Sequence, residues 1–206
     1  MRLAPYCSPR YVRRMEVTLT LAQDPEADRL LAADPFALLS GMLLDQQFPM
    51  ERAFAGPYLL ATRLGHPDRL DPALIVATDD ETLQAAAAGP PAIHRYPGSM
   101  IGRIKALADV VVTQYGGNAE RIWTDPGDGN AVVKRLKALP GFGDQKSRIF
   151  LALVAKRLGV KPRGWQQACS PYGAKGTRMS IADVTDRTTL DQVRAFKQQA
   201  KAAARS

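Results

Sequence analysis

The stretch that most constrains this chain runs from Leu136 to Leu153 and reads L-K-A-L-P-G-F-G-D-Q-K-S-R-I-F-L-A-L. Apolar residues flank the turn Pro140-Gly141-Phe142-Gly143, so the pattern predicts two helices joined by a short glycine hairpin. Two glycines one residue apart allow positive φ angles and keep side chains away from an approaching group. The second helix is expected to begin at about Asp144, where the first backbone N–H groups lack partners within the helix.

Three residues near this predicted helix start point to an anion site: Lys146, Ser147 and Arg148. A helix N-terminus with cations beside it favours negative charge. On an exposed turn the most natural anion is a phosphate of a nucleic-acid backbone, which is bound without reading any base. The alternative is an ordinary pair of antiparallel helices, in which Gly-Phe-Gly only turns the chain.

The distribution of charge favours the nucleic-acid interpretation. The 206-residue chain has a net charge of +8, and residues 134–163 hold nine basic residues against one acidic residue. Residues 16–93 hold four basic residues against twelve acidic ones. Positive charge gathered around a phosphate-type motif is typical of a nucleic-acid binder. An all-α protein-interaction domain without nucleic acid does not explain this concentration.

Composition argues against several other classes of protein. No apolar run approaches the ~18 residues of a membrane span, and the first residues lack the apolar segment of a secretory signal. Two cysteines, Cys7 and Cys169, are too few for a disulfide framework or a four-cysteine metal site. We therefore expect a monomeric cytoplasmic protein, associated with the nucleoid if bacterial, that has no metal, no cofactor and no contact with membranes.

Helix start signals recur along the chain, and no alternating strand pattern or internal repeat accompanies them. Asp24-Pro25, Asp34-Pro35 and Asp71-Pro72 each place a capping residue before a proline at the first helical position. We predict an all-α protein with residues 1–15 as a disordered basic arm, or alternatively a DNA-contacting one, and residues 16–206 as one helical domain. The predicted helices cover residues 35–47, 72–77, 79–88, 98–115, 129–139 and 188–204, and a further one near Phe54 is expected to break at Gly56-Pro57.

Three segments in a fixed order carry a resemblance to a known family. They are D-P-F-A-L-L-S-G-M-L-L-D-Q-Q from Asp34, I-H-R-Y-P-G-S-M-I-G-R-I-K-A-L from Ile93, and L-P-G-F-G-D-Q-K-S from Leu139. Together they resemble the helix-hairpin-helix (HhH-GPD) superfamily of DNA glycosylases, which includes endonuclease III, over roughly residues 24–165. The resemblance implies two helical lobes with a cleft that receives a nucleotide flipped out of double-stranded DNA, and the cysteine count excludes the iron–sulfur cluster of some relatives.

The resemblance also implies roles for individual residues. Gln46 and Gln47 would fill the hole left by the flipped nucleotide, although a solvated helix end is the alternative for both. His94 and Tyr96 would contribute to the base pocket, with a purely structural histidine as the alternative. The residues implied in phosphate binding are Pro140, Gly141, Phe142, Gly143, Lys146, Ser147 and Arg148.

The chain departs from the family at the catalytic positions. Bifunctional members carry a lysine two residues after the second hairpin glycine, where this chain has Gln145. Lys146 lies one residue later, a rotation of about 100° on a helix, so we expect it to face phosphate and expect no lyase activity. No acidic residue lies between Asp144 and Asp183, where the family has its catalytic aspartate.

Asp45 is the first candidate to replace that aspartate and Asp183 the second, with a helix cap as the alternative role for each. Gln145 is kept as a third catalytic candidate because of its position. The sequence therefore predicts a monofunctional DNA glycosylase that hydrolyses the N-glycosidic bond of a damaged or modified base. A protein of the same fold that binds lesions or abasic sites without catalysis is the second hypothesis.

Overall fold

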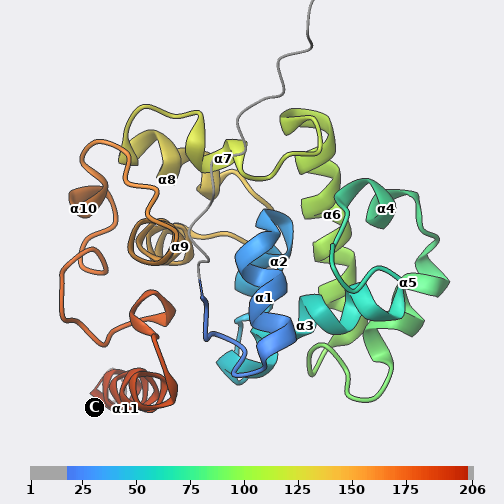
Figure 1. Ribbon diagram of the computed structural model, residues 1–206, viewed down its shortest axis with the longest axis horizontal. Coiled ribbons are helices and arrows are strands. Elements are labelled where there is room, and N and C mark those ends of the chain that lie inside the picture. Colours follow the sequence, from blue (N-terminus) through green and yellow to red (C-terminus); the bar gives the residue numbers. More distant parts are fainter. Residues whose placement is uncertain (1–17, 204–206) are drawn as a thin grey trace, which may run out of the picture.

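The computed structural model describes residues 18–203, and the regular elements in that range are helices joined by loops, with a single isolated β-bridge between Asp128 and Arg163 (Figure 1). The predicted arm at residues 1–15 lies outside the described residues. The helices are α1 (Pro25–Ala33), α2 (Pro35–Leu44), α3 (Met50–Arg63), α4 (Pro72–Ala77), α5 (Asp80–Ala88), α6 (Pro97–Tyr115), α7 (Arg121–Thr124), α8 (Gly129–Lys137), α9 (Asp144–Arg157), α10 (Trp165–Ala168), the 3₁₀ turn η1 (Ile181–Asp183) and α11 (Arg187–Ala203). The prediction of an all-α protein is confirmed for the described part of the chain.

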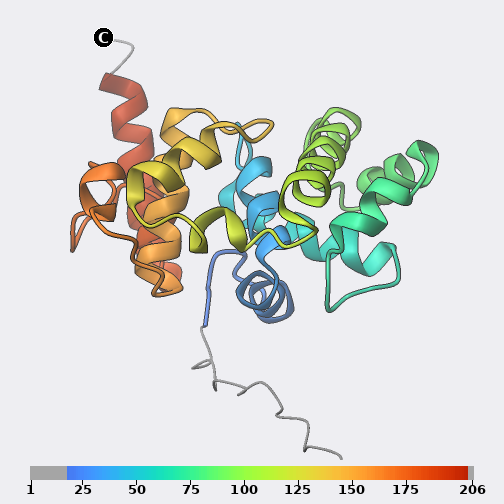
Figure 2. The ribbon, with the colours of Figure 1, turned by 90° about the horizontal axis from the view of Figure 1, so that it is seen from above.

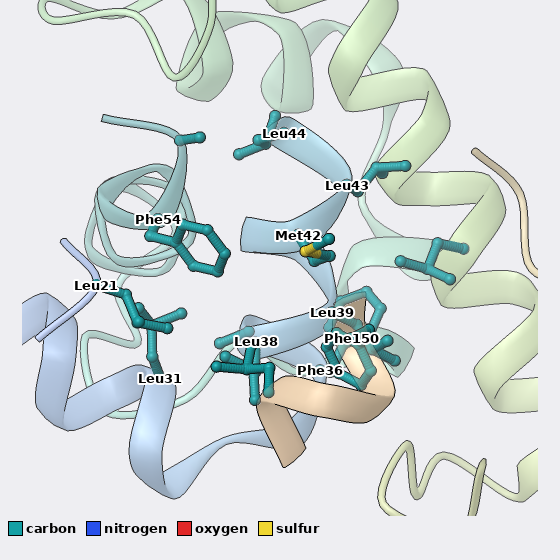
Figure 3. Packing of buried hydrophobic residues seen from close by; sticks show 14 of the residues in the cluster. Leu21, Leu31, Phe36, Leu38, Leu39, Met42, Leu43, Leu44, Phe54 and Phe150 are labelled. Carbon is teal, nitrogen blue, oxygen red and sulfur yellow. The ribbon is translucent and has the colours of Figure 1, made fainter. Parts of the chain in front are cut away.

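Helix α2 lies at the centre of the molecule. Every residue from Phe36 to Leu44 is buried, as expected of a helix that is apolar on all sides. Figure 3 shows α2 side chains packed between Phe54 of α3 and Phe150 of α9. Gly41 allows this close approach, because a Cβ atom at that position would lie 2.7 Å from the Phe54 ring.

The remaining helices flank α2 in two groups. In both views α4, α5 and α6 lie on one side of α2, and α8, α9, α10 and α11 lie on the other (Figures 1 and 2). One continuous apolar core joins the groups, since a single cluster of buried residues includes Ile104 of α6, Leu39 of α2 and Leu153 of α9. The C-terminal end of α2, at Leu44, and the residues Asp45 and Gln46 that follow it therefore lie where the two groups of helices meet.

The predicted capping residues are confirmed. The carboxylates of Asp24, Asp34 and Asp71 accept hydrogen bonds from first-turn N–H groups of α1, α2 and α4. Helix α2 ends at Leu44 instead of Gln47, because Gln47 adopts a left-handed φ of 52° and Pro49 follows. The predicted break at Gly56-Pro57 is wrong: α3 runs through it, and Gly56 lets the helix pack against Leu44.

Candidate functional site

The hairpin between α8 and α9 uses its two glycines for different purposes. Gly141 has a φ of 78°, and a Cβ atom there would lie 2.3 Å from Cδ1 of Leu43 on α2. Gly143 is the N-cap of α9, and a Cβ atom there would have nothing within 4 Å. Gly141 therefore seats the hairpin on α2, while Gly143 leaves open space in front of the start of α9.

The start of α9 is capped differently from most helices in the chain. Six of the described helices begin at an aspartate whose carboxylate accepts first-turn N–H groups, but Gly143 offers no side-chain acceptor to α9. Asp144 follows, and its carboxylate binds Lys137 at 3.0 Å and Arg148 at 2.7 Å. These two cations hold the pKa of Asp144 below its usual value, Arg148 contributing most. The first-turn N–H groups of α9 thus remain available to an external acceptor.

Lys146 joins the hairpin to the end of α2. Its ammonium donates a hydrogen bond of 3.0 Å to the carbonyl oxygen of Leu43, which also accepts one of 2.7 Å from Gln46. Burial lowers the pKa of Lys146 to about 8, although the nearby Asp45 carboxylate opposes that shift. This face of α9 packs against α2 and directs the Lys146 ammonium toward the end of that helix.

A cavity of about 650 Å³ opens beside Lys146, and four separate segments of the chain line it, one of which is the loop that holds Tyr172 and Met179. The end of α2 and the loop after it supply one wall, α9 supplies the second and α11 the third. The principal lining residues are Asp45, Gln47, Phe48, Gln145, Lys146, Ile149, Arg194, Phe196 and Lys197. The structure therefore brings the candidates Asp45, Gln47, Gln145 and Lys146 to one place.

Asp45 is the acidic residue of this cavity. Its side chain is 13% exposed, and Oδ2 lies 3.5 Å from the ammonium of Lys197 on α11. Within residues 18–203 its other oxygen, Oδ1, accepts no recorded hydrogen bond. Asp45 is also the residue that ends α2, so a rigid buried helix fixes its backbone. A carboxylate that has a fixed position and one oxygen without a hydrogen-bond partner can accept a proton or stabilise a developing positive charge.

The two predicted flipping glutamines differ in their surroundings. The Gln46 amide is held at both ends, by Leu43 at 2.7 Å and by Arg103 of α6 at 3.1 Å. Gln47 is exposed at the rim of the cavity and takes a left-handed backbone conformation, which is uncommon for a residue other than glycine. Of the pair, Gln47 is the one whose side chain is exposed.

Several side chains that were predicted to contact phosphate make their contacts within the protein instead. Ser147 is fully buried and donates its hydroxyl to the carbonyl of Gly143 at 2.8 Å. Arg148 binds Asp144 and donates to the carbonyl of Ala168 at 3.1 Å. Phe142 is buried edge-on against Phe150. These side chains hold the hairpin in place, and a phosphate would meet its backbone instead.

The predicted base-pocket residues lie outside the cavity. His94 is 2% exposed, and its Nε2 and Nδ1 atoms pair with the Gln46 carbonyl at 3.0 Å and the Tyr96 N–H at 3.2 Å. These partners fix a neutral ring that donates from Nε2, and burial lowers its pKa. Tyr96 is 59% exposed on the surface. The aromatic residues that do line the cavity are Phe48, Tyr172 and Phe196.

Asp183 is a structural carboxylate in this fold. Its side chain is 3% exposed and binds Lys156 at 2.7 Å, Thr177 at 3.0 Å and the Met179 N–H at 2.9 Å. It caps η1 and does not line the cavity. Gln145 does line it, and its amide donates to the Tyr172 hydroxyl at 3.0 Å.

Sequence reasoning missed the contribution of α11. Arg194, Phe196 and Lys197 face the cavity about fifty residues after the hairpin, and Arg194 forms a close ion pair with Glu51 of α3. Their spacing on an amphipathic helix gives no sign of that role, because α11 reaches the cavity through tertiary packing only. In the described part of the chain, no group of His, Cys, Asp or Glu side chains is arranged to hold a metal ion.

Comparison with known proteins gives no assignment. No protein-family model matches the chain, and no curated protein matches it in sequence. Among the helices between residues 18 and 203, none is both long and apolar enough to cross a lipid bilayer. The function must therefore be argued from the cavity and the hairpin.

Proposed function

We propose that this protein is a DNA glycosylase, probing double-stranded DNA and hydrolysing the N-glycosidic bond of a damaged or modified base that has flipped out of the duplex. The observation that carries the proposal is the meeting of three features within one region. These are the open hairpin at Gly143, the exposed Gln47, and Asp45 with Lys146 in a cavity of about 650 Å³. The two groups of helices around α2 would be the two lobes of an HhH-GPD-like fold.

Each feature has a part in the proposed reaction. The backbone N–H groups at the start of α9 would bind a phosphate beside the lesion, since Gly143 leaves room for its oxygens. The flipped nucleotide would enter the cavity, and Gln47 would occupy the space left in the stack. Arg103 and Lys197 add positive charge around the opening, because both act on the ammonium of Lys146.

Asp45 would carry the chemistry of base release. As the C1′–N bond lengthens, its electrons move to the departing base and positive charge grows on the sugar. The Asp45 carboxylate stabilises that charge and takes the proton of the water whose oxygen bonds to C1′. The proton held by Asp45 then passes to the departed base, directly or through solvent, which restores the carboxylate and leaves a free base and an abasic site. Lys197 holds one oxygen of Asp45 and leaves the other for this work.

Lys146 favours a second candidate activity, strand cleavage at the abasic site. A lysine amine in a cavity with a pKa of about 8 has an appreciable neutral fraction near pH 7.5. The neutral amine would attack the C1′ aldehyde of an abasic site and lose water to form an imine. Loss of a C2′ proton to solvent would then expel the 3′ phosphate, which breaks the strand. Reduction of that imine by borohydride would join protein and DNA covalently, and Lys146→Gln would abolish the adduct.

The first experiment concerns the hairpin. Gly143→Asp places a carboxylate in the open space at the start of α9, where a phosphate is expected, so duplex affinity at low salt should fall about tenfold or more. Fluorescence anisotropy with a labelled duplex measures the change. Gly127→Asp is the matched control, because its Cβ position is equally open but lies at the opposite end of α8. Equal affinity of the two variants would exclude DNA binding through the hairpin.

A lesion-binding protein without catalysis, the alternative function, would give the same result in that experiment. It differs in base release, which it would lack with every damaged duplex. Asp45→Asn should abolish release by the glycosylase while leaving duplex affinity within about twofold.

A further inference from the structure

The cavity carries more positive than negative charge, which bears on the kind of base it can accept. Lys146 and Lys197 bring two ammonium groups to its lining, against the single carboxylate of Asp45. Arg194 also lines the cavity, but Glu51 and Asp191 pair with its guanidinium. Around Asp45 and the two lysines, the balance is therefore one positive charge in excess when both lysines are protonated.

The uncharged part of the lining suits a flat, unsaturated ring. Phe48, Phe196 and Ile149 present ring and aliphatic surface, and three methionines, Met42, Met50 and Met179, add polarisable sulfur. Aromatic rings alone would attract a cationic ring through their π faces. In this cavity the ammonium groups of Lys146 and Lys197 would repel a cationic ring and so oppose that attraction.

The polar groups are mostly hydrogen-bond donors. Lysine ammonium groups can only donate, and the amides of Gln47 and Gln145 can donate or accept. Lys146 uses one of its three N–H groups on Leu43, so others remain for a ligand. The carbonyl oxygens of a neutral ring can accept hydrogen bonds from these donors. A positively charged ring adds no acceptor for them and is repelled by the lysine ammonium groups.

We infer that the cavity selects an electrically neutral, carbonyl-rich base, of the deaminated or oxidised kind, and rejects cationic N-alkylated purines, with Lys197 of α11 as a specificity-determining residue. The inference rests on the proposed function, because it concerns the base that enters the same cavity. It assigns α11 a part in substrate choice in addition to closing one wall.

The test compares three duplexes that differ in a single purine and resist cleavage through a 2′-fluoro sugar. They carry guanine, the neutral 8-oxoguanine, or the cationic 7-methylguanine. Affinities of the full-length protein are measured by anisotropy, and each lesion is expressed relative to guanine. We expect 8-oxoguanine to be preferred over 7-methylguanine by about tenfold or more, from one net like charge in a partly shielded site.

Two variants separate the specific effect of Lys197 from general charge. Lys197→Met keeps the length of the side chain and should reduce the preference at least threefold. Arg187→Met removes a charge from the exposed start of α11, away from the cavity, and should leave the preference unchanged.

Each result bears differently on the two proposals. Equal or stronger binding of 7-methylguanine would overturn the inference about neutral bases while leaving DNA binding and base release intact. A preference for 8-oxoguanine that persists in Lys197→Met would overturn the role of Lys197. Failure to bind any of the duplexes would overturn the proposed function and this inference together.

Discussion

At the scale of single residues, the two carboxylates considered for catalysis have opposite surroundings. Asp183 is surrounded by donors, from Lys156, Thr177 and the backbone, and has no capacity left for a substrate. Asp45 has one oxygen near Lys197 and lines a cavity. The number of partners, and not position in the sequence, separates a structural carboxylate from one that can react.

The Asp183 network predicts a large loss of stability when it is broken. Asp183→Ala should lower the free energy of unfolding by about 3–5 kcal/mol, because Lys156, whose side chain is only 16% exposed, would lose its counter-charge. Urea unfolding measures this loss. Asp45→Asn is the comparison and should cost below about 1 kcal/mol, since its partner Lys197 is 39% exposed. Equal losses in the two variants would contradict the assignment of roles.

Lys146 makes the stability of the protein depend on pH in the alkaline range. Its pKa is about 8 in the folded protein against an ordinary value of 10.5, so between these values the unfolded chain binds more protons. Stability therefore rises with pH in that window. Between pH 7 and pH 9.5 the wild type should gain about 2 kcal/mol relative to Lys146→Met, as measured by urea unfolding. Parallel pH profiles for the two proteins would show that Lys146 is not buried as described.

At the scale of elements, α11 completes the cavity and combines ion pairs with core packing. Arg194 pairs with Glu51, and Lys197 with Asp45 and the sulfur of Met50, so ion pairs tie this helix to the end of α2 and the start of α3. Leu190 and Val193 of α11 are buried in the apolar core. By contrast, α2 is buried along its whole length. The cavity thus has one wall from a helix buried on all sides and one wall from a helix that combines core packing with ion pairs.

Removing one of these ties should loosen α11 selectively. In Arg194→Ala, amide hydrogen exchange across residues 187–203 is expected to accelerate about tenfold, while exchange in α9 stays unchanged. Mass spectrometry of peptides after deuteration resolves the two helices. Arg187→Ala, which removes an exposed pair with Asp191, should leave both rates as in the wild type. Uniform acceleration in α9 and α11 would instead indicate general destabilisation.

Much of the helical organisation could be predicted from the sequence, because it depends on local signals. The capping aspartates, the glycine hairpin and the periodicity of residues 98–115 lie within a few positions of the structure they determine. The direction of Lys146 could not be predicted, since it depends on α2 packing against α9, about a hundred residues away along the chain. The same holds for His94, Lys197 and Phe196, whose surroundings come from distant segments.

At the scale of the whole molecule, α2 lies between two groups of helices and ends where they meet (Figures 1 and 2). The hairpin, the exposed Gln47 and the cavity with Asp45 gather at that end. A duplex lying across the junction could contact the hairpin with its backbone and place one nucleotide in the cavity. The central claim is that this arrangement releases a base.

Base release from a panel of duplexes tests this claim most directly. Each duplex carries one lesion, and abasic products are revealed by alkali treatment. The wild type is expected to release at least one damaged base, and Asp45→Asn is expected to release none while still binding the duplex. Strand scission without alkali, lost in Lys146→Gln, would add the lyase step. Undiminished release by Asp45→Asn, or no release from any duplex by the wild type, would contradict the account.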